Sequence, residues 1–129
     1  MKGQTLLVNI YDAPSELLSS EEIIRLFLVR AVEFIDMTPI LHTLQVAHFP
    51  TPIKGILRGG YGLSAGMVLV ESHIYIHTWP ENGYSAIDII AENKDEAYKI
   101  LEKLQKILQP KNVYVAEILR GISEDWGET

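Results

Sequence analysis

The residues that could do chemistry gather at the centre of the chain, in the run 71–84. This run holds a carboxylate, a hydroxyl and two imidazoles, on Glu71, Ser72, His73 and His77. A serine hydroxyl attacks a carbonyl carbon when a base accepts its proton, and histidine is the side chain whose unperturbed pKa lies closest to neutral pH. These residue types at this spacing are candidates for nucleophilic or metal chemistry.

Two familiar kinds of site can be written from these residues. A hydrolase triad of Ser72, His77 and Asp88 lacks the G-x-S-x-G turn that exposes such a serine in α/β-hydrolases. A metal site on His73 and His77 needs converging side chains, but four residues along a strand separate them by about 13 Å at roughly 3.3 Å per residue. The plainest alternative is that His77 is a hydrogen-bonded residue of an ordinary sheet.

The chain around Ser72 is predicted to form a hairpin. Strand-like runs at 67–70 and 74–78 are followed by a turn signal at 80–83 and a further strand at 84–90. Alternate residues of a strand share a face, so one face of the second run carries His73, Tyr75, His77 and Trp79. The two histidines are therefore expected to point the same way.

The four-residue turn also predicts the pairing within the hairpin. Counting outward gives these cross-strand pairs: Trp79 with Tyr84, His77 with Ala86, Tyr75 with Asp88, and Glu71 with Glu92. Glu92 is thus expected beside the Glu71–Ser72 peptide bond.

One helix is expected before the hairpin and one after it. Ser19 and Glu22 form a capping-box pattern, and apolar residues at helical spacing continue it over roughly 20–36. Asn93 is a suitable N-cap for a second helix, which should end at Pro110.

Strands at 5–11 and 113–118 are expected near the two ends of the chain. The stretch 38–49 is extended in character, and the glycine-rich stretch 55–66 is expected to be a long connection. The resulting order, β-α-β-β-β-α-β, predicts an α+β fold: a two-layer sandwich with a mainly antiparallel sheet and two helices on one face. The tail after Gly121 is expected to be loose.

Composition limits the class of protein. A chain of 129 residues with 47% hydrophobic content is expected to form a single domain over 1–129. The net charge of −6 argues against nucleic acid as a partner, because phosphates are bound by Lys and Arg. No run is long enough to span a bilayer, and the first residues resemble no signal peptide, so we expect no membrane partner and a cytoplasmic location. The lack of cysteine excludes disulfides and cysteine nucleophiles.

The run 71–84 closely resembles the self-cleavage signature of the prokaryotic S-adenosylmethionine decarboxylase proenzymes, E-S-H-x-x-I-H-T-W-P-E-x-G-Y. The resemblance extends more loosely over almost the whole chain. It includes an opening strand that ends in tyrosine, Ser64 upstream of the motif, a helix after Glu92, and V-x-V-x-E-x-x-R-G at 113–121.

By this resemblance, the Ser72 hydroxyl attacks the carbonyl of Glu71, and the ester that forms undergoes β-elimination to leave a pyruvoyl group derived from Ser72. Glu71 would then end the β chain. The family's processing serine and histidine match Ser64 and His77, and the histidine helps to remove the Cα proton. A pyruvoyl carbonyl forms a Schiff base with a substrate amine and accepts the electrons left by carbon dioxide, so neither pyridoxal phosphate nor a metal is implied.

Two positions depart from the family pattern. The family's catalytic cysteine, a proton donor, falls at Glu92 by ungapped count, where a carboxylic acid could donate the proton if burial beside Glu71 kept it protonated. The glutamate associated with the substrate's ribose falls at Asn9, whose amide accepts a hydrogen bond without the strength of a charge. Extra residues at 52–58 also lengthen the link into Ser64.

The resemblance implies an enzyme that decarboxylates a small molecule, S-adenosylmethionine, and so makes the aminopropyl donor for spermidine and other polyamines. Asn9 leaves open the same pyruvoyl chemistry on arginine or ornithine. The missing cysteine leaves open a family member that does not cleave itself and serves as a regulatory subunit for an active homologue. Family members pair as dimers of the cleaved protomer, so a homodimer is expected.

Overall fold

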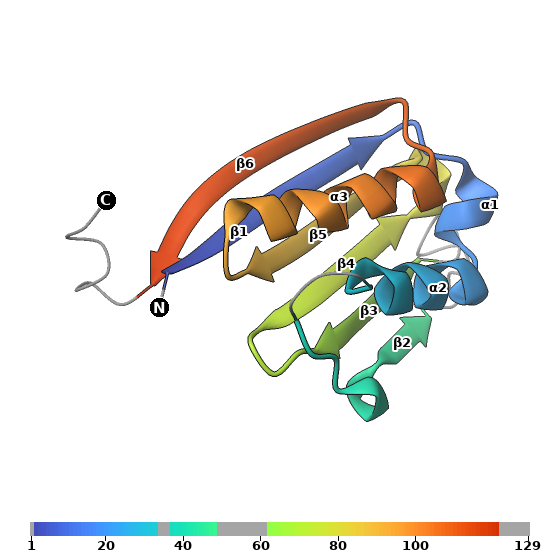
Figure 1. Cartoon of the computed structure of the whole chain (residues 1–129). Coiled ribbons are helices and arrows are strands. Elements are labelled where there is room, and N and C mark those ends of the chain that lie inside the picture. The colour runs from blue at the N-terminus through green and yellow to red at the C-terminus, as the bar shows by residue number, and fades with distance from the viewer. Residues whose placement is uncertain (1, 34–36, 49–61, 122–129) are drawn as a thin grey trace.

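The computed structural model describes residues 2–33, 37–48 and 62–121. Within these residues six strands form one sheet in the order β2-β3-β4-β5-β1-β6, and every neighbouring pair is antiparallel (Figure 1). The strands are β1 Lys2–Tyr11, β2 Gln45–His48, β3 Leu63–Val68, β4 His73–Trp79, β5 Tyr84–Ala91 and β6 Asn112–Gly121.

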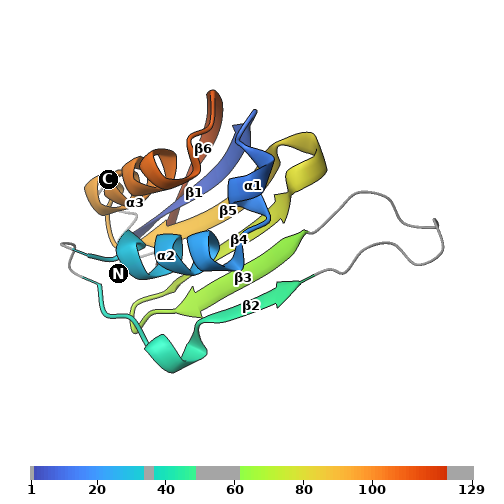
Figure 2. The ribbon, with the colours of Figure 1, turned by 90° about the vertical axis from the view of Figure 1, so that its right-hand side faces the viewer.

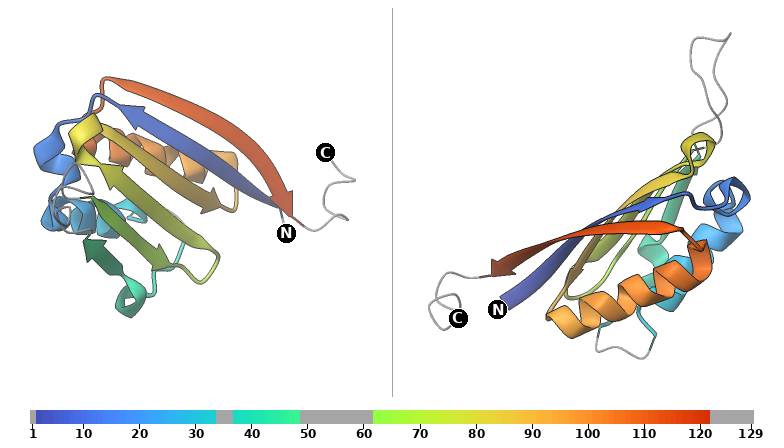
Figure 3. Two further views of the ribbon diagram at one scale, coloured as in Figure 1. Left: turned by 180° about the vertical axis from the view of Figure 1, so that it is seen from behind. Right: turned by 90° about the horizontal axis from the view of Figure 1, so that it is seen from above.

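The α-helices of the described chain all lie against the same face of the sheet (Figures 2 and 3). They are α1 Ser15–Leu18, α2 Glu21–Ala31 and α3 Lys94–Leu108. Seen from behind, the sheet lies in front of the helices, and its other face is open (Figure 3). This arrangement confirms the predicted two-layer α+β sandwich, with a third, very short helix added.

The core lies between the sheet and the two longer helices. Phe27 of α2 and Leu104 of α3 are fully buried against inward-facing strand residues such as Ile76. Burial alternates along β4 and β5, because successive side chains of a strand point to opposite faces. The chemistry-bearing residues of these strands are consequently the ones that face away from the helices.

Helix α2 begins one residue later than the capping-box pattern predicts. The Ser20 side chain accepts a hydrogen bond from the Ile23 backbone N at 3.2 Å, and Ser20 is the N-cap. Ser19 instead ends α1, and its hydroxyl donates to the Ser15 carbonyl oxygen at 2.9 Å. The extra turn of α1 engages Ser19, so the backbone N–H groups that need a cap begin after Ser20.

The sheet has one strand more than the predicted order. The stretch Gln45–His48, which was expected only to be extended, pairs with β3, which begins at Leu63 inside the stretch predicted to be a connection. Strand pairing uses backbone groups, so small residues such as Ser64 and Gly66 can pair although they carry little of the composition that marks a strand.

The central hairpin has the predicted register for its inner pairs, with Trp79 opposite Tyr84 and His77 opposite Ala86. The turn between the strands contains a short 3-10 helix at Pro80–Asn82. Gly83 follows with a φ of 62°, a left-handed conformation that glycine adopts without strain.

The outermost pair predicted for this hairpin is wrong. The β4–β5 ladder ends with Ile74 opposite Ile89, so Glu71 and Glu92 are not paired. Glu71 instead belongs to the turn that precedes β4, and the chain there turns toward β3.

Helix α3 has the predicted start and end. The Asn93 side chain accepts a hydrogen bond from the Glu96 backbone N at 2.9 Å. The helix stops at Leu108, where Gln109 adopts a left-handed φ of 52° and Pro110 follows. The chain then returns as β6, which pairs with β1 over the full length of both strands.

Some predictions lie outside the described residues: the end of the first helix at 34–36, the additional residues at 52–58 and the tail at 122–129. Among the helices that the structure describes, none is long and apolar enough to cross a bilayer.

Candidate active site

Ser64 and His77 lie directly opposite each other on β3 and β4. Both are half-buried and belong to the open face of the sheet, because their neighbours Ala65 and Ile76 are buried on the helix side. Side chains of directly opposed residues have Cβ atoms about 4.5–5.5 Å apart. The hydroxyl and the imidazole that the family resemblance singled out therefore share one site.

His77 is held in a defined environment. Its ring packs at a tilt on the Trp79 ring, with centroids 4.2 Å apart, and its main-chain carbonyl accepts a hydrogen bond from Ser85 Oγ at 2.7 Å. Burial lowers the pKa of His77 below the usual 6.5, because the charged form loses hydration. At neutral pH the imidazole is therefore mainly neutral and able to accept a proton.

A buried hydroxyl on Thr78 fixes the end of the β3–β4 ladder. Thr78 Oγ1 accepts a hydrogen bond from the Leu63 backbone N at 3.0 Å and donates one to the Leu18 carbonyl oxygen at 2.8 Å. Its side chain is fully buried. This one hydroxyl ties β4 to the residue before Ser64 and to the last residue of α1.

The Glu71–Ser72 peptide bond lies in the turn between β3 and β4. The Leu69 backbone N donates to the Ser72 carbonyl oxygen at 2.8 Å, which brings the two ends of the turn together. Val70 is 65% exposed, whereas Ser72 is half-buried. The Glu71 carboxylate accepts a hydrogen bond from the Thr38 backbone N at 2.8 Å. The turn has a defined conformation.

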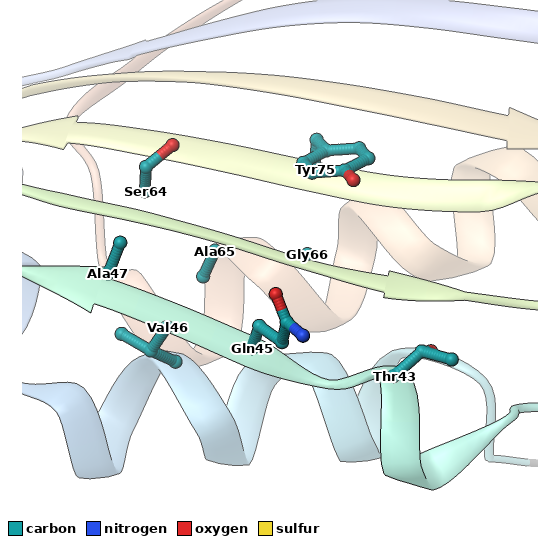
Figure 4. A pocket seen from close by; sticks show the side chains of 8 residues that line it. All are labelled: Thr43, Gln45, Val46, Ala47, Ser64, Ala65, Gly66 and Tyr75. Atoms are coloured by element: carbon teal, nitrogen blue, oxygen red, sulfur yellow. The ribbon is translucent and has the colours of Figure 1, made fainter.

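A cavity of about 190 Å³ opens beside Ser64, and Figure 4 shows the side chains around it. Its lining is Thr43, Gln45, Val46, Ala47, Ser64, Ala65, Gly66 and Tyr75. The Tyr75 ring lies against Gly66 so closely that a Cβ there would come within 2.5 Å of Tyr75 Cε1. The described residues that line the cavity carry hydroxyl and amide groups but no charge.

Asn9 of β1 lies in the same cross-strand row as His77, because both residues flank Ala86 of β5. Its side-chain oxygen accepts a hydrogen bond from the Tyr84 hydroxyl at 3.0 Å. The Tyr84 ring in turn stacks on Trp79, with centroids 5.0 Å apart. The amide oxygen at the predicted ribose position is thus already engaged within the protein.

Glu92 is exposed and follows directly after β5. The carboxylate of Glu71 is hydrogen-bonded to Thr38 and does not lie beside Glu92. The burial next to Glu71 on which the predicted acid role of Glu92 depended is therefore not found.

The structure also bears on the two alternative sites, the hydrolase triad and the metal site. For the hydrolase triad, Asp88 is the register partner of Tyr75, and Ala86 occupies the place directly opposite His77. In the part of the chain that the structure describes, no three His, Asp or Glu side chains lie close enough together to hold a metal ion.

A model of the family described as S-adenosylmethionine decarboxylase matches residues 4–121 of this chain. The chain belongs to the S-adenosylmethionine decarboxylase family. The S-adenosylmethionine decarboxylase proenzyme of Thermotoga petrophila is 33% identical over 126 residues, which cover 97% of this chain and 88% of that protein. The corresponding proenzyme of Methanococcus maripaludis is 31% identical over 123 residues, covering 95% of this chain and 92% of that protein.

Solved structures agree with this membership. The crystal structure of the adenosylmethionine decarboxylase of Aquifex aeolicus superposes with a TM-score of 0.72 at 26% identity, covering 93% of this chain and 91% of that one. S-adenosylmethionine decarboxylases are carboxy-lyases, so this family member is a carbon–carbon lyase with a small-molecule substrate.

Two threonines of this family member were missed by sequence reasoning. Thr78 stands inside the recognised motif, and its only signal was strand alternation, which placed a hydroxyl on the core face beside His77. Thr38 is 33 residues from Glu71 in the chain, and no local pattern connects the two.

Proposed function

We propose that this chain is one self-processing domain that splits between Glu71 and Ser72 and then acts as a pyruvoyl-dependent decarboxylase of S-adenosylmethionine. The supporting observation is the placement of Ser64 opposite His77, on the two strands that the scissile turn connects. A hydroxyl, a neutral imidazole and the bond to be rearranged then belong to one hairpin, with the Ser64–His77 pair four register positions, about 13 Å, from the end that carries the Glu71–Ser72 bond.

In the first step, Ser72 Oγ attacks the carbonyl carbon of Glu71. A C–O bond forms, the peptide C–N bond breaks, and the hydroxyl proton ends on the amine that is released. The product is an ester that links Glu71 to the Ser72 side chain. Ser64 is the proposed hydrogen-bonding partner for the oxygen on which charge develops, a role carried over from the family resemblance, because in this structure Ser64 lies at the end of the β3–β4 ladder away from the 69–72 turn.

In the second step, by the family resemblance, the His77 imidazole removes the Cα proton of residue 72, which requires the new amino terminus to move toward His77 from its place at the start of β4. The Cβ–O bond breaks, and its electron pair leaves on the main-chain carboxylate of Glu71. The dehydroalanine that remains adds water and loses ammonia, which produces the pyruvoyl group. The lowered pKa of His77 supports its role as the base, because the neutral form predominates at neutral pH.

The pyruvoyl group supplies an electrophilic carbonyl that accepts the electrons of the departing carboxyl group. The residues of this chain then bind the substrate and return a proton. Glu92 is a candidate proton donor by its place in the motif count alone, because the structure leaves it exposed and away from Glu71, and the uncharged cavity beside Ser64 is proposed to hold part of the substrate. The product would be the aminopropyl donor for spermidine synthesis.

A second substrate class has one specific observation in its favour. The side-chain oxygen of Asn9 already accepts a hydrogen bond from the Tyr84 hydroxyl, so this position offers no charge and only the second lone pair of an amide oxygen for a ribose. Arginine or ornithine, which carry no ribose, would not need that contact. The same pyruvoyl chemistry would apply to either amino acid.

We also propose that two protomers associate through the open face of the sheet. This face carries six large hydrophobic side chains that are 37–61% exposed: Leu7, Tyr11, Tyr75, Trp79, Tyr114 and Ile118. A monomer seldom leaves such a patch in water. Light scattering after size exclusion tests this, and a Tyr75→Arg variant should shift the protein toward monomer.

Mass spectrometry of the purified protein tests the processing. The proposal expects two fragments, 1–71 and 72–129, with the second lacking a free amino group because its first residue is pyruvoyl. Ser72→Ala should stay intact while keeping the fold, since alanine fits the half-buried turn position. A wild-type chain that stays whole after prolonged incubation would instead support a non-catalytic family member.

Release of labelled carbon dioxide then identifies the substrate. Carboxyl-labelled S-adenosylmethionine, arginine and ornithine are offered to the split protein under identical conditions. Release from S-adenosylmethionine supports the leading assignment. Release only from arginine or ornithine would contradict the leading assignment and support a free amino acid as the substrate.

A further inference from the structure

The residue on the acyl side of the scissile bond uses its own side chain as an anchor. The Glu71 carboxylate accepts one hydrogen bond from the Thr38 backbone N at 2.8 Å and another from Thr38 Oγ1 at 3.3 Å. Both carboxylate oxygens are therefore used by a single residue. Hydrogen bonds to an ionised carboxylate are roughly twice as strong as those between neutral groups.

The backbone reinforces this contact. The Val70 backbone N donates to the Thr38 carbonyl oxygen at 2.9 Å, and the Ile40 backbone N donates to the Val68 carbonyl oxygen at 3.0 Å. The segment before β2 thus runs beside the end of β3 as an irregular continuation of the β2–β3 ladder. Thr38 is its last contact, and that contact is made to residues 70 and 71.

These bonds lie on one side of the scissile peptide. Val70 and Glu71 are attached to Thr38, whereas the other side begins β4, whose first register partner is Val68 opposite His73. Each of the two ends that cleavage would create therefore has an anchor of its own. The Glu71–Ser72 peptide bond therefore connects a residue held by Thr38 to a residue at the start of β4.

The geometry points to a positioning clamp, made by Thr38 and the Glu71 carboxylate, that holds the Glu71 carbonyl carbon within reach of Ser72 Oγ. This inference rests on the proposed self-processing. An intramolecular attack depends steeply on the placement of the reacting atoms, so a misplacement of about 1 Å can cost about a hundredfold in rate. Thr38 and the Glu71 side chain are positioning groups, because neither takes part in bond making.

The clamp also acts after the chain splits. When the ester Cβ–O bond breaks, the electron pair stays on the main-chain carboxylate of Glu71, so this residue then carries two carboxylates. Thr38 already donates two hydrogen bonds to one of them and accepts one from Val70. The new carboxyl terminus accordingly stays docked beside the site.

Two substitutions of Glu71 separate hydrogen bonding from charge. Glu71→Ala removes both acceptors, and splitting should slow by about tenfold to a hundredfold, by the same dependence on placement. Glu71→Gln keeps an oxygen for the Thr38 backbone N and an amide that can donate to the Thr38 hydroxyl, so it should split within about threefold of wild type. The readout is the fraction of split chain against time, at matched thermal midpoints. Glu22→Ala, which removes an exposed carboxylate of α2, is the matched control and should split at the wild-type rate.

Hydroxylamine, which cleaves esters, shows which step is affected. Glu71→Ala should accumulate no more hydroxylamine-sensitive chain than wild type, because in this variant the attack that forms the ester becomes the slow step. Glu71→Ala splitting at the wild-type rate, or Glu71→Gln as slow as Glu71→Ala, would overturn the clamp. If Glu71→Ala does not fold, hydrogen exchange on the split wild-type protein decides: the Val70 and Thr38 amides should stay protected, and rapid exchange of both would refute the docked terminus.

The wild-type chain in the same time course separates the two proposals. If it never splits, the proposed function fails and the clamp fails with it. If the wild-type chain splits and Glu71→Ala splits at the same rate, only the clamp is wrong.

Discussion

Ser64 and His77 form the terminal pair of the β3–β4 ladder. Beyond this pair, the backbone N of Leu63 donates to the Thr78 side chain instead of to a backbone carbonyl. The ladder therefore ends at the two residues whose side chains the proposed processing uses. The buried Thr78 hydroxyl thus helps to set the register that places Ser64 of β3 opposite His77 of β4.

Removal of the Ser64 hydroxyl should slow processing without harming the fold. Ser64→Ala is expected to split about tenfold to a hundredfold more slowly, because positioned hydrogen-bonding or acid–base groups contribute on this order or more. Its free energy of unfolding should change by less than about 0.5 kcal/mol, as for other substitutions outside the core. Ser64→Thr, which keeps the hydroxyl, is the control. Equal splitting rates for wild type and Ser64→Ala would remove Ser64 from the mechanism.

The processing rate should depend on pH through His77. Burial lowers its pKa below 6.5, so the neutral, proton-accepting form persists to more acidic pH than in an exposed histidine. The splitting rate should be flat above 6.5 and fall only as the pH drops through the lowered pKa. Time courses between about pH 5 and pH 8 measure this. A midpoint above 6.5 would contradict the assignment.

Elimination, rather than ester formation, should be the step that His77 controls. A His77→Ala variant is expected to collect ester, which hydroxylamine converts into two fragments with an unmodified Ser72 at the new terminus. Wild type treated in the same way supplies the comparison. A variant that neither splits nor responds to hydroxylamine would place His77 in the first step instead.

Loss of the Thr78 hydroxyl should destabilise the protein. Thr78→Val leaves the Leu63 N–H and the Leu18 carbonyl buried without this partner, which costs on the order of 1–3 kcal/mol in unfolding free energy. Thr78→Ser keeps the hydroxyl and should lose less, about 1 kcal/mol for the missing methyl group. Urea unfolding of the Ser72→Ala form measures both without interference from splitting. A valine variant as stable as the serine variant would show that these bonds contribute little.

Asn9 should tune substrate choice. Asn9→Glu restores a carboxylate at the family's ribose position and should raise kcat/KM for S-adenosylmethionine by about tenfold, since a charged acceptor strengthens a hydrogen bond by roughly 1.4 kcal/mol or more. Tyr84→Phe is the matched control, because it frees the Asn9 oxygen without adding charge. Carbon dioxide release from the two substrates gives the ratio of kcat/KM for S-adenosylmethionine to kcat/KM for arginine. An unchanged ratio in both variants would show that this row does not contact the ribose.

Glu92 is tested by an isosteric change. Glu92→Gln removes the acid while keeping the shape, so decarboxylation should slow by about a hundredfold if Glu92 returns the proton. Glu92→Cys supplies the family's thiol at this position and should decarboxylate at least as fast as wild type. Splitting precedes this step and serves as the internal reference. Should both variants decarboxylate at the wild-type rate, Glu92 has no part in proton transfer.

Local pattern was sufficient for the central hairpin and for α3. Strand alternation placed His77 on the open face, the turn signal set His77 opposite Ala86, and Asn93 marked the helix start. It was not sufficient for β2 and the start of β3, because Ser64, Ala65 and Gly66 pair through their backbones and show little strand composition. The pairing of Glu71 with Glu92 was wrong because a count along two strands does not detect where the ladder ends.

The sequence by itself determined the family, the position of the Glu71–Ser72 bond and the face on which His77 lies, because each depends on residues that are neighbours in the chain. Only the tertiary structure decided three contacts. Thr38 donates to the Glu71 carboxylate, the Thr78 hydroxyl joins β3, β4 and α1, and the Tyr84 hydroxyl donates to the Asn9 side-chain oxygen. Those contacts join residues 15 to 75 positions apart. They form only when the sheet and the helices pack, since hydrogen-bonding partners that distant in the chain are brought together by the core rather than by any local preference.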